Sequence, residues 1–127
     1  MNHLATIVAA VAHWIWGALW YGVLGASWAA AVGKHAAQSD PMPYIISFVA
    51  LLVAAYVIAD LFRRIGINTL AGGAKTGALI GVAIVGAYLA LFYGYQARPL
   101  ALWLIDGGYA VIGVALMGAI IGGWRRK

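Results

Sequence analysis

Four stretches of about 20 mainly apolar residues constrain the fold of this chain more than any other feature. A helix needs about 20 such residues to cross the hydrocarbon core of a bilayer, because each residue adds about 1.5 Å of length. The spans that follow from this rule are 4–24, 43–62, 76–95 and 100–123. We therefore predict an all-α membrane protein, a four-transmembrane-helix bundle that forms one domain over residues 1–127.

The composition argues against a soluble protein and against a nucleic-acid partner. Hydrophobic residues make up 65% of the chain and charged residues 9%, whereas soluble domains carry about 25% charged residues. The net charge is +5, but the eight Lys and Arg residues are scattered between apolar runs and form no continuous basic face. The chain has no cysteine, and His3, His13 and His35 are expected at three different depths. We therefore expect no metal site and no cofactor.

The first span resembles a signal peptide in its position but not in its length. It lacks a preceding Lys or Arg and exceeds the apolar core of about 7–15 residues that such peptides have, although an alanine-rich segment at 26–31 leaves cleavage conceivable. We expect a retained anchor. Residues 25–41 are mildly amphipathic and rich in alanine. They predict a short interfacial helix between the first and second spans, which ends before Pro41 and Pro43 begin the next helix.

Lysine and arginine in the loops predict the orientation. Six of them fall on the side of both termini, and two fall on the other side. The six are Arg63, Arg64, Lys75, Arg125, Arg126 and Lys127, and the two are Lys34 and Arg98. Because positive loops stay inside, we expect both termini in the cytoplasm. Asp60 precedes two of these arginines by three and four residues, which predicts an ion pair at the helix end.

Small residues recur at four-residue spacing and predict where helices touch. In lipid, helices associate through close approach of their backbones rather than through hydrophobic burial. The first span has such a ridge around His13, and the glycines expected at helix contacts are Gly17, Gly77, Gly81, Gly107, Gly108, Gly118 and Gly122. Two interpretations remain open, namely packing within one bundle and an interface in a homodimer.

Asp106 is the only charged residue of the fourth span. Counted from Leu100, Asp106 lies about 9 Å below the outer boundary of the membrane. A charge at the centre of a membrane helix costs about 2.5–3.5 kcal/mol on insertion. We expect its carboxyl to face a polar partner in the bundle, with Gly107 and Gly108 leaving room for it. Candidate partners are the indoles of Trp16 and Trp20 and the hydroxyls of Tyr88 and Tyr109. A structural carboxyl and a proton- or ligand-handling carboxyl both remain open.

His13 lies near the middle of the first span, on the ridge of small residues. A hydrogen bond to another helix is one expectation, and a proton pair with Asp106 is the other. Arg98 lies about 12 Å of helix rise above Asp106, so it would reach the carboxyl only by folding inward.

These residues also carry a family resemblance. The chain resembles a family of small bacterial membrane proteins catalogued only as a domain of unknown function. Its members open with Met-Asn, end the first span in Gly-x-Leu-Trp-Tyr, and have an Arg-Pro-Leu turn before Ile-Asp-x-Gly-Tyr and a Gly-Ala-Ile-like ending. The matching segments here are 1–2, 17–21, 98–100, 105–109 and 118–120. The resemblance implies a four-span protein of the bacterial inner membrane and brings no activity, ligand or partner with it.

The motifs of common enzymes are absent from the sequence. It contains no G-x-S-x-G, no glycine-rich phosphate loop and no histidine pair at helical spacing, so we do not expect an enzyme. One function that fits is a non-enzymatic structural, accessory or ligand-binding membrane protein, in contact with lipid and with a second copy or another membrane protein. The alternative is a small proton-coupled transporter or channel that uses Asp106 and His13. Small multidrug-resistance transporters are similar in size, but they keep their essential acid in the first span, where this chain has His13.

Overall fold

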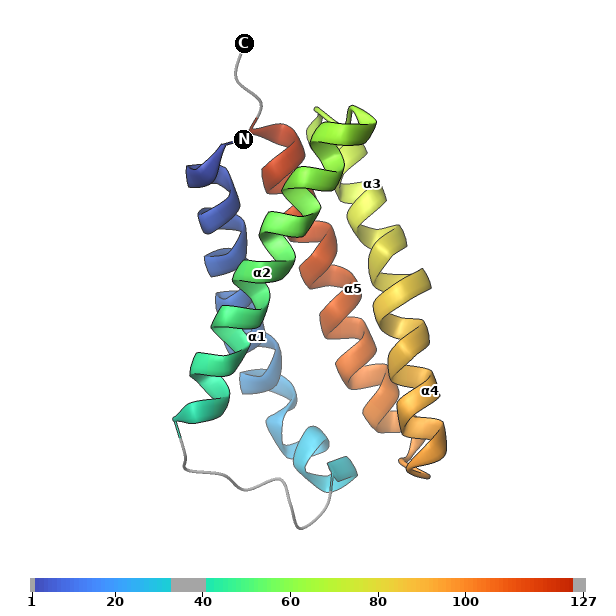
Figure 1. Cartoon of the computed structure of the whole chain (residues 1–127). Helices are drawn as coiled ribbons and strands as arrows, with labels where there is room; N and C mark the ends of the chain where they lie inside the picture. Colours follow the sequence, from blue (N-terminus) through green and yellow to red (C-terminus); the bar gives the residue numbers. More distant parts are fainter. Residues whose placement is uncertain (1, 33–40, 125–127) are drawn as a thin grey trace.

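Every regular element that the structure describes is helical. The computed structural model describes residues 2–32 and 41–124. The elements in chain order are α1 (His3–Val32), α2 (Met42–Ile65), α3 (Leu70–Ile80), η1 (Gly81–Gly86), α4 (Ala87–Tyr95) and α5 (Leu100–Gly123). Because α3, η1 and α4 follow one another directly, the chain has four helical spans long and apolar enough to cross a membrane. The prediction of an all-α, four-span membrane protein is confirmed (Figure 1).

The first and third spans differ most from the bounds that the sequence suggested, and the second span ends three residues later, at Ile65. α1 runs to Val32 rather than to residue 24, because the alanine-rich segment after it favours helix and no proline interrupts it. The expected interfacial helix is not shown, since residues 26–32 belong to α1 and residues 33–40 lie outside the described residues. The third span starts at Leu70 rather than at residue 76. The hydroxyl of Thr69 caps this helix by accepting the Gly72 N–H at 2.9 Å.

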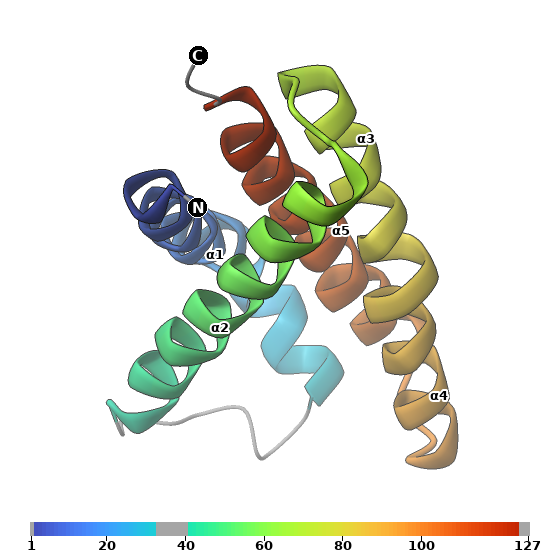
Figure 2. The ribbon, with the colours of Figure 1, turned by 45° about the horizontal axis from the view of Figure 1, so that its top comes forward.

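α5 is the central helix of the bundle. It packs against α1 on one side and against α3 and η1 on another, whereas α2 packs mainly on α1 (Figures 1 and 2). The buried core combines the first half of α1 with the second halves of α2 and α5. Its members are Ala9, Ala10, Ala55, Ile58, Ala59, Phe62, Val114, Met117 and Ile121. The core therefore occupies the half of the bundle that carries both chain termini, which we call the terminal end.

The opposite end of the bundle is more open. α2 diverges from α5 and α4 toward its first residue (Figure 2), and residues 41–46 are all exposed. The first half of α2 keeps a contact with α1, where the Trp14 indole donates to the Ser47 hydroxyl at 3.2 Å and packs on Phe48. The first two turns of α5 are consequently flanked by α1 and α4 rather than by α2.

Glycines bring the backbones of α3 and α5 together. Gly73 faces Gly118 and Gly122, and Gly77 faces the backbone of Val114 and Ala115. Further along the same contact, a side chain at Gly81 would lie 2.7 Å from the Cα of Val111. The structure thus places four of the glycines expected at helix contacts, Gly77, Gly81, Gly118 and Gly122, between helices of one chain.

We expect Gly118→Ala to lower the free energy of unfolding by about 1–3 kcal/mol, the usual cost of overpacking. The added methyl group would overlap the carbonyl of Gly73 and lie 3.3 Å from the Cα of Gly77, and a helix backbone cannot move aside as a side chain can. Thermal or SDS unfolding in detergent measures the change. Gly94→Ala is the control, because a methyl group there meets nothing within 4 Å. An equal loss of stability in both variants would contradict the contact.

Candidate functional site

The Asp106 carboxyl joins three helices at the open end of the bundle. Asp106 lies two turns into α5 and is partly exposed. Its Oδ1 accepts a hydrogen bond from the Tyr21 hydroxyl of α1, and its Oδ2 accepts one from the Tyr93 hydroxyl of α4 at 2.5 Å. Both oxygens therefore have a donor from a neighbouring span. Hydroxyl donors offset part of the cost of placing a carboxyl at this depth.

The two hydroxyls are not the donors that the sequence suggested. The indole of Trp20 donates to the Ile105 carbonyl at 2.9 Å, and that of Trp16 donates to the Tyr109 carbonyl at 3.3 Å. Both indoles thus bind the backbone of α5 on either side of Asp106. Tyr88 is 58% exposed and packs against the Phe92 ring, on another face of its helix.

Tyr21 and Tyr93 were not expected as donors, because the candidates were residues whose Cα atoms lie at the same depth as that of Asp106. A tyrosine hydroxyl lies far from its own Cα, so it reaches a group at a different depth. Their positions in the sequence could have indicated them, because Tyr21 directly follows Trp20 and Tyr93 lies close to the turn before α5.

Aromatic rings surround the carboxyl and its donors. The ring centroid of Tyr21 lies 5.2 Å from that of Tyr109 and 6.0 Å from that of Trp28. Glycines leave the room that these rings need. A side chain at Gly17 would come within 3.1 Å of the Tyr109 ring, and one at Gly108 would come equally close to the Trp20 indole. Of the two glycines expected to leave room for a partner of the carboxyl, Gly108 thus leaves room for an indole that binds the backbone, and among the described residues Gly107 meets only Trp103 of its own helix.

His13 is buried one layer deeper, away from the carboxyl. It is 3% exposed, its ring lies 5.0 Å from that of Tyr109, and a side chain at Gly113 would overlap its imidazole. Neither ring nitrogen has a hydrogen-bond partner in the described part of the chain. The expected hydrogen bond to another helix is therefore not made, because the residue opposite His13 is a glycine with no side chain to offer.

The described charged residues lie in two groups, one at each end of the bundle. At the terminal end, Asp60 pairs with Arg63 at 2.5 Å and with Arg64 at 2.7 Å, which confirms the predicted ion pair. At the opposite end, Arg98 does not fold inward. Its Nη1 donates to the Val32 carbonyl at 3.3 Å and its Nε donates to Gln96 at 3.1 Å. Within residues 2–32 and 41–124, Asp106 has no ion-pair partner.

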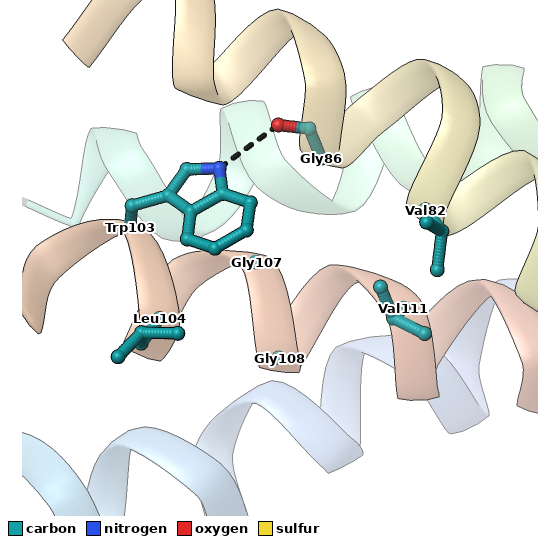
Figure 3. Close-up of a pocket in the computed structure, with 7 residues that line it drawn as sticks. All are labelled: Val82, Gly86, Trp103, Leu104, Gly107, Gly108 and Val111. Atoms are coloured by element: carbon teal, nitrogen blue, oxygen red, sulfur yellow. Dashed lines mark hydrogen bonds between the residues drawn. The ribbon is translucent and has the colours of Figure 1, made fainter. Parts of the chain in front are cut away.

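A second feature near the site is an apolar cavity of about 200 Å³ between η1 and α5. Figure 3 shows the Trp103 indole lying over Gly107 and donating to the Gly86 carbonyl, at 2.9 Å. The residues that line it are Val82, Gly86, Trp103, Leu104, Gly107, Gly108 and Val111. The wide π-helical turn of η1 and the glycines of α5 leave this space, and its lining offers no charged group.

Comparison with known proteins gives a family. A family described as Protein of unknown function (DUF1761) matches residues 4–122. The chain belongs to this family. The matched range holds all the residues of the site around Asp106, and it agrees with the resemblance read from the sequence motifs. No curated protein and no solved structure matches the chain. Its activity is therefore argued from the geometry of the site.

Substituting the two tyrosines tests how strongly the carboxyl joins the helices of this family member. Tyr21→Phe and Tyr93→Phe should each lower the free energy of unfolding by about 0.6–1.7 kcal/mol, the range for side-chain hydrogen bonds between membrane helices. In an Asp106→Leu background the same changes should cost nothing, because the acceptor is gone. Double-mutant cycles in detergent measure the coupling.

Tyr88→Phe is the matched control, since Tyr88 is exposed on the same span as Tyr93 and its ring contact survives the change. A coupling energy near zero for both tyrosines would show that the carboxyl does not hold the helices together.

Proposed function

We propose that this protein is a non-enzymatic, multi-pass protein of the bacterial inner membrane that acts by binding, with the Asp106 carboxyl as its binding site. The observation that carries the proposal is the incomplete coordination of this group. A carboxylate can accept about four hydrogen bonds, and Asp106 accepts one on each oxygen. It is also partly exposed and has no ion-pair partner in the described part of the chain. Acceptor capacity and charge are thus left for a ligand.

The surroundings of Asp106 favour binding over catalysis. Acid–base or nucleophilic chemistry needs a second reactive group within hydrogen-bond reach of the first. Among the described residues, the groups that bond to Asp106 are two tyrosine hydroxyls, and no histidine, lysine, arginine or second carboxyl bonds to it. His13 packs against Gly113 and Tyr109 instead, and its nitrogens have no partner among the described residues.

The alternative expected from the sequence, a proton-coupled transporter or channel, is not favoured by this geometry. A transport path would need polar groups that continue from Asp106 along α5 toward the terminal end. The residues that follow on the side of the bundle core are Ala110, Val114 and Met117, and all three are buried and apolar. On α1, the buried polar residues of the described chain are Thr6 and His13. The Thr6 hydroxyl donates to the Asn2 carbonyl and the His13 nitrogens have no partner, so within the described residues no continuous hydrogen-bonded path leads from the carboxyl to the terminal end.

The proposal also includes lipid and other membrane proteins as partners. Lipid is the first of them, since large apolar side chains on α2 and α4 are exposed along the spans. A second copy or another membrane protein would cover part of these exposed faces. The faces therefore support an accessory role, and either α2 or α4 could make the contact.

The positions of the termini support an orientation with both ends in the cytoplasm. The Asn2 side chain donates to the Trp124 carbonyl at 3.4 Å, so both ends of the described chain lie together (Figure 1). Arg63, Arg64 and Lys75 lie at the same end. We expect green fluorescent protein fused to the C-terminus to fluoresce and alkaline phosphatase fused there to be inactive. Phosphatase inserted after Ala97 should be active, and the reverse pattern would contradict the orientation.

Carbodiimide labelling tests whether Asp106 is accessible. The chain has three carboxyl side chains, Asp40, Asp60 and Asp106. Dicyclohexylcarbodiimide, which partitions into lipid, should modify Asp106 in membranes over a range of pH, and mass spectrometry of the intact protein and its peptides measures the product. Asp106→Asn should lose this adduct, while a water-soluble carbodiimide should still label Asp60. If Asp106 stays unmodified in the folded protein but reacts after unfolding, it is sealed and the proposed binding site is wrong.

A further inference from the structure

We propose that the Asp106 site takes a lipophilic organic cation, an ammonium or phosphonium group that carries apolar substituents. This inference rests on the proposed function, because it names the ligand class of the same site. It follows from three properties of the described residues, namely a carboxyl without an ion-pair partner, aromatic rings beside its hydroxyl donors and the partial exposure of the site.

The first property is charge. A carboxylate in apolar surroundings is costly unless a positive charge or several donors compensate it. Asp106 has two hydroxyl donors, which compensate it in part. Arg98, the basic residue described at this end of the bundle, is held by Val32 and Gln96. The missing positive charge would therefore come from the ligand.

The second property is the aromatic surround. The Tyr21 ring, whose hydroxyl donates to the carboxyl, contacts the rings of Tyr109 and Trp28, and the Tyr93 ring carries the second donor. Aromatic faces attract cations by about 0.5–2 kcal/mol each, and most strongly where water is excluded. Apolar substituents on the cation would also lie in the bilayer, where the free ligand already partitions. An aromatic surround and an acid together select a cation with apolar groups rather than a hydrated metal ion.

Other ligand classes fit less well. An anion would meet the carboxyl of Asp106, and the described residues at this end offer no free basic group to bind it, since Arg98 is held by Val32 and Gln96. A metal ion would need further ligands, and no cluster of three acidic or histidine side chains exists among the described residues. A neutral apolar molecule would gain nothing from the carboxyl and would fit the cavity between η1 and α5, whose lining is free of charge.

The third property is access. Asp106 is partly exposed, as are Tyr21, Trp28 and Tyr93. α2 diverges from α5 at this end, and its first residues are exposed. Because Asp106 is itself partly exposed, a ligand can contact its carboxyl without separating the glycine contact of α3 and α5.

The experiment is a competition on the wild-type protein in nanodiscs. Tetraphenylphosphonium should slow the labelling of Asp106 by dicyclohexylcarbodiimide in a saturable way. Tetraphenylborate, which has nearly the same shape and the opposite charge, should not. Equal protection by both ions, or protection by neither, would overturn the inference. Because this comparison uses only the wild-type protein, it does not depend on whether a variant folds.

Direct binding gives the second readout. Equilibrium dialysis with radiolabelled tetraphenylphosphonium should show a loss of affinity of about tenfold or more in Asp106→Asn, and a smaller loss in Tyr93→Phe. Asp60→Asn and Tyr88→Phe should bind as the wild type does, since Asp60 pairs with arginines at the terminal end and Tyr88 is exposed away from the carboxyl. Unchanged binding in a folded Asp106→Asn would also overturn the inference.

The outcomes separate the two proposals. If Asp106 is labelled and tetraphenylphosphonium does not protect it, the carboxyl is accessible and only the proposed ligand class is wrong. The carboxyl would then bind a proton rather than an organic cation. If Asp106 is never labelled in the folded protein, the proposed function itself fails.

Discussion

The close contact between the backbones of α3 and α5 is the interaction on which the rest of this structure depends. Lipid gives two apolar helices little reason to associate, so their attraction comes from dispersion between atoms that approach closely. Gly73, Gly77 and Gly118 allow that approach. Because α3, η1 and α4 form one span, the same contact also sets where α4 lies. It thereby brings Tyr93 to Asp106. A side chain in place of a glycine at the terminal end would shift the span and change the position of Tyr93 at the opposite end of the bundle.

The two ends of the bundle have different chemistry. At the terminal end, Phe62 and Met117 are fully buried among small apolar residues of three helices, and the charged groups lie outside that core. At the opposite end, α2 moves away and polar contacts take over. The carboxyl of Asp106 holds α1 and α4, and Arg98 holds the last carbonyl of α1. The largest fully buried side chains thus lie at the terminal end, whereas the carboxyl that has no ion-pair partner among the described residues lies at the opposite end.

Features that depend on neighbours in sequence could be predicted. The ion pair of Asp60 follows from helical spacing, and the four spans follow from apolar length. Four of the glycines expected at helix contacts, Gly77, Gly81, Gly118 and Gly122, lie against the backbone of another helix, whereas within the described part of the chain Gly107 meets only Trp103 of its own helix. Predictions that required a partner on another helix went less well. Of the expected donors to Asp106, Trp16 and Trp20 bind the backbone, Tyr88 is exposed, and the Tyr109 ring packs on Tyr21 and His13. The ring of His13 meets a glycine. The π-helical turn and the full length of α1 left no signal that periodicity alone could detect.

By itself, then, the amino-acid sequence determined that this chain has four spans long and apolar enough to cross a membrane, that glycines recur at four-residue spacing along them, and that the acid of the last span needs a polar partner. Those properties follow from length, spacing and the cost of a charge in hydrocarbon, all of which are local. Only the tertiary structure decided that the hydroxyls of Tyr21 and Tyr93 meet that acid and that α2 leaves it partly open. These depend on how far each helix is rotated and splayed about its neighbours, and rotation and splay arise from the packing of all four spans together.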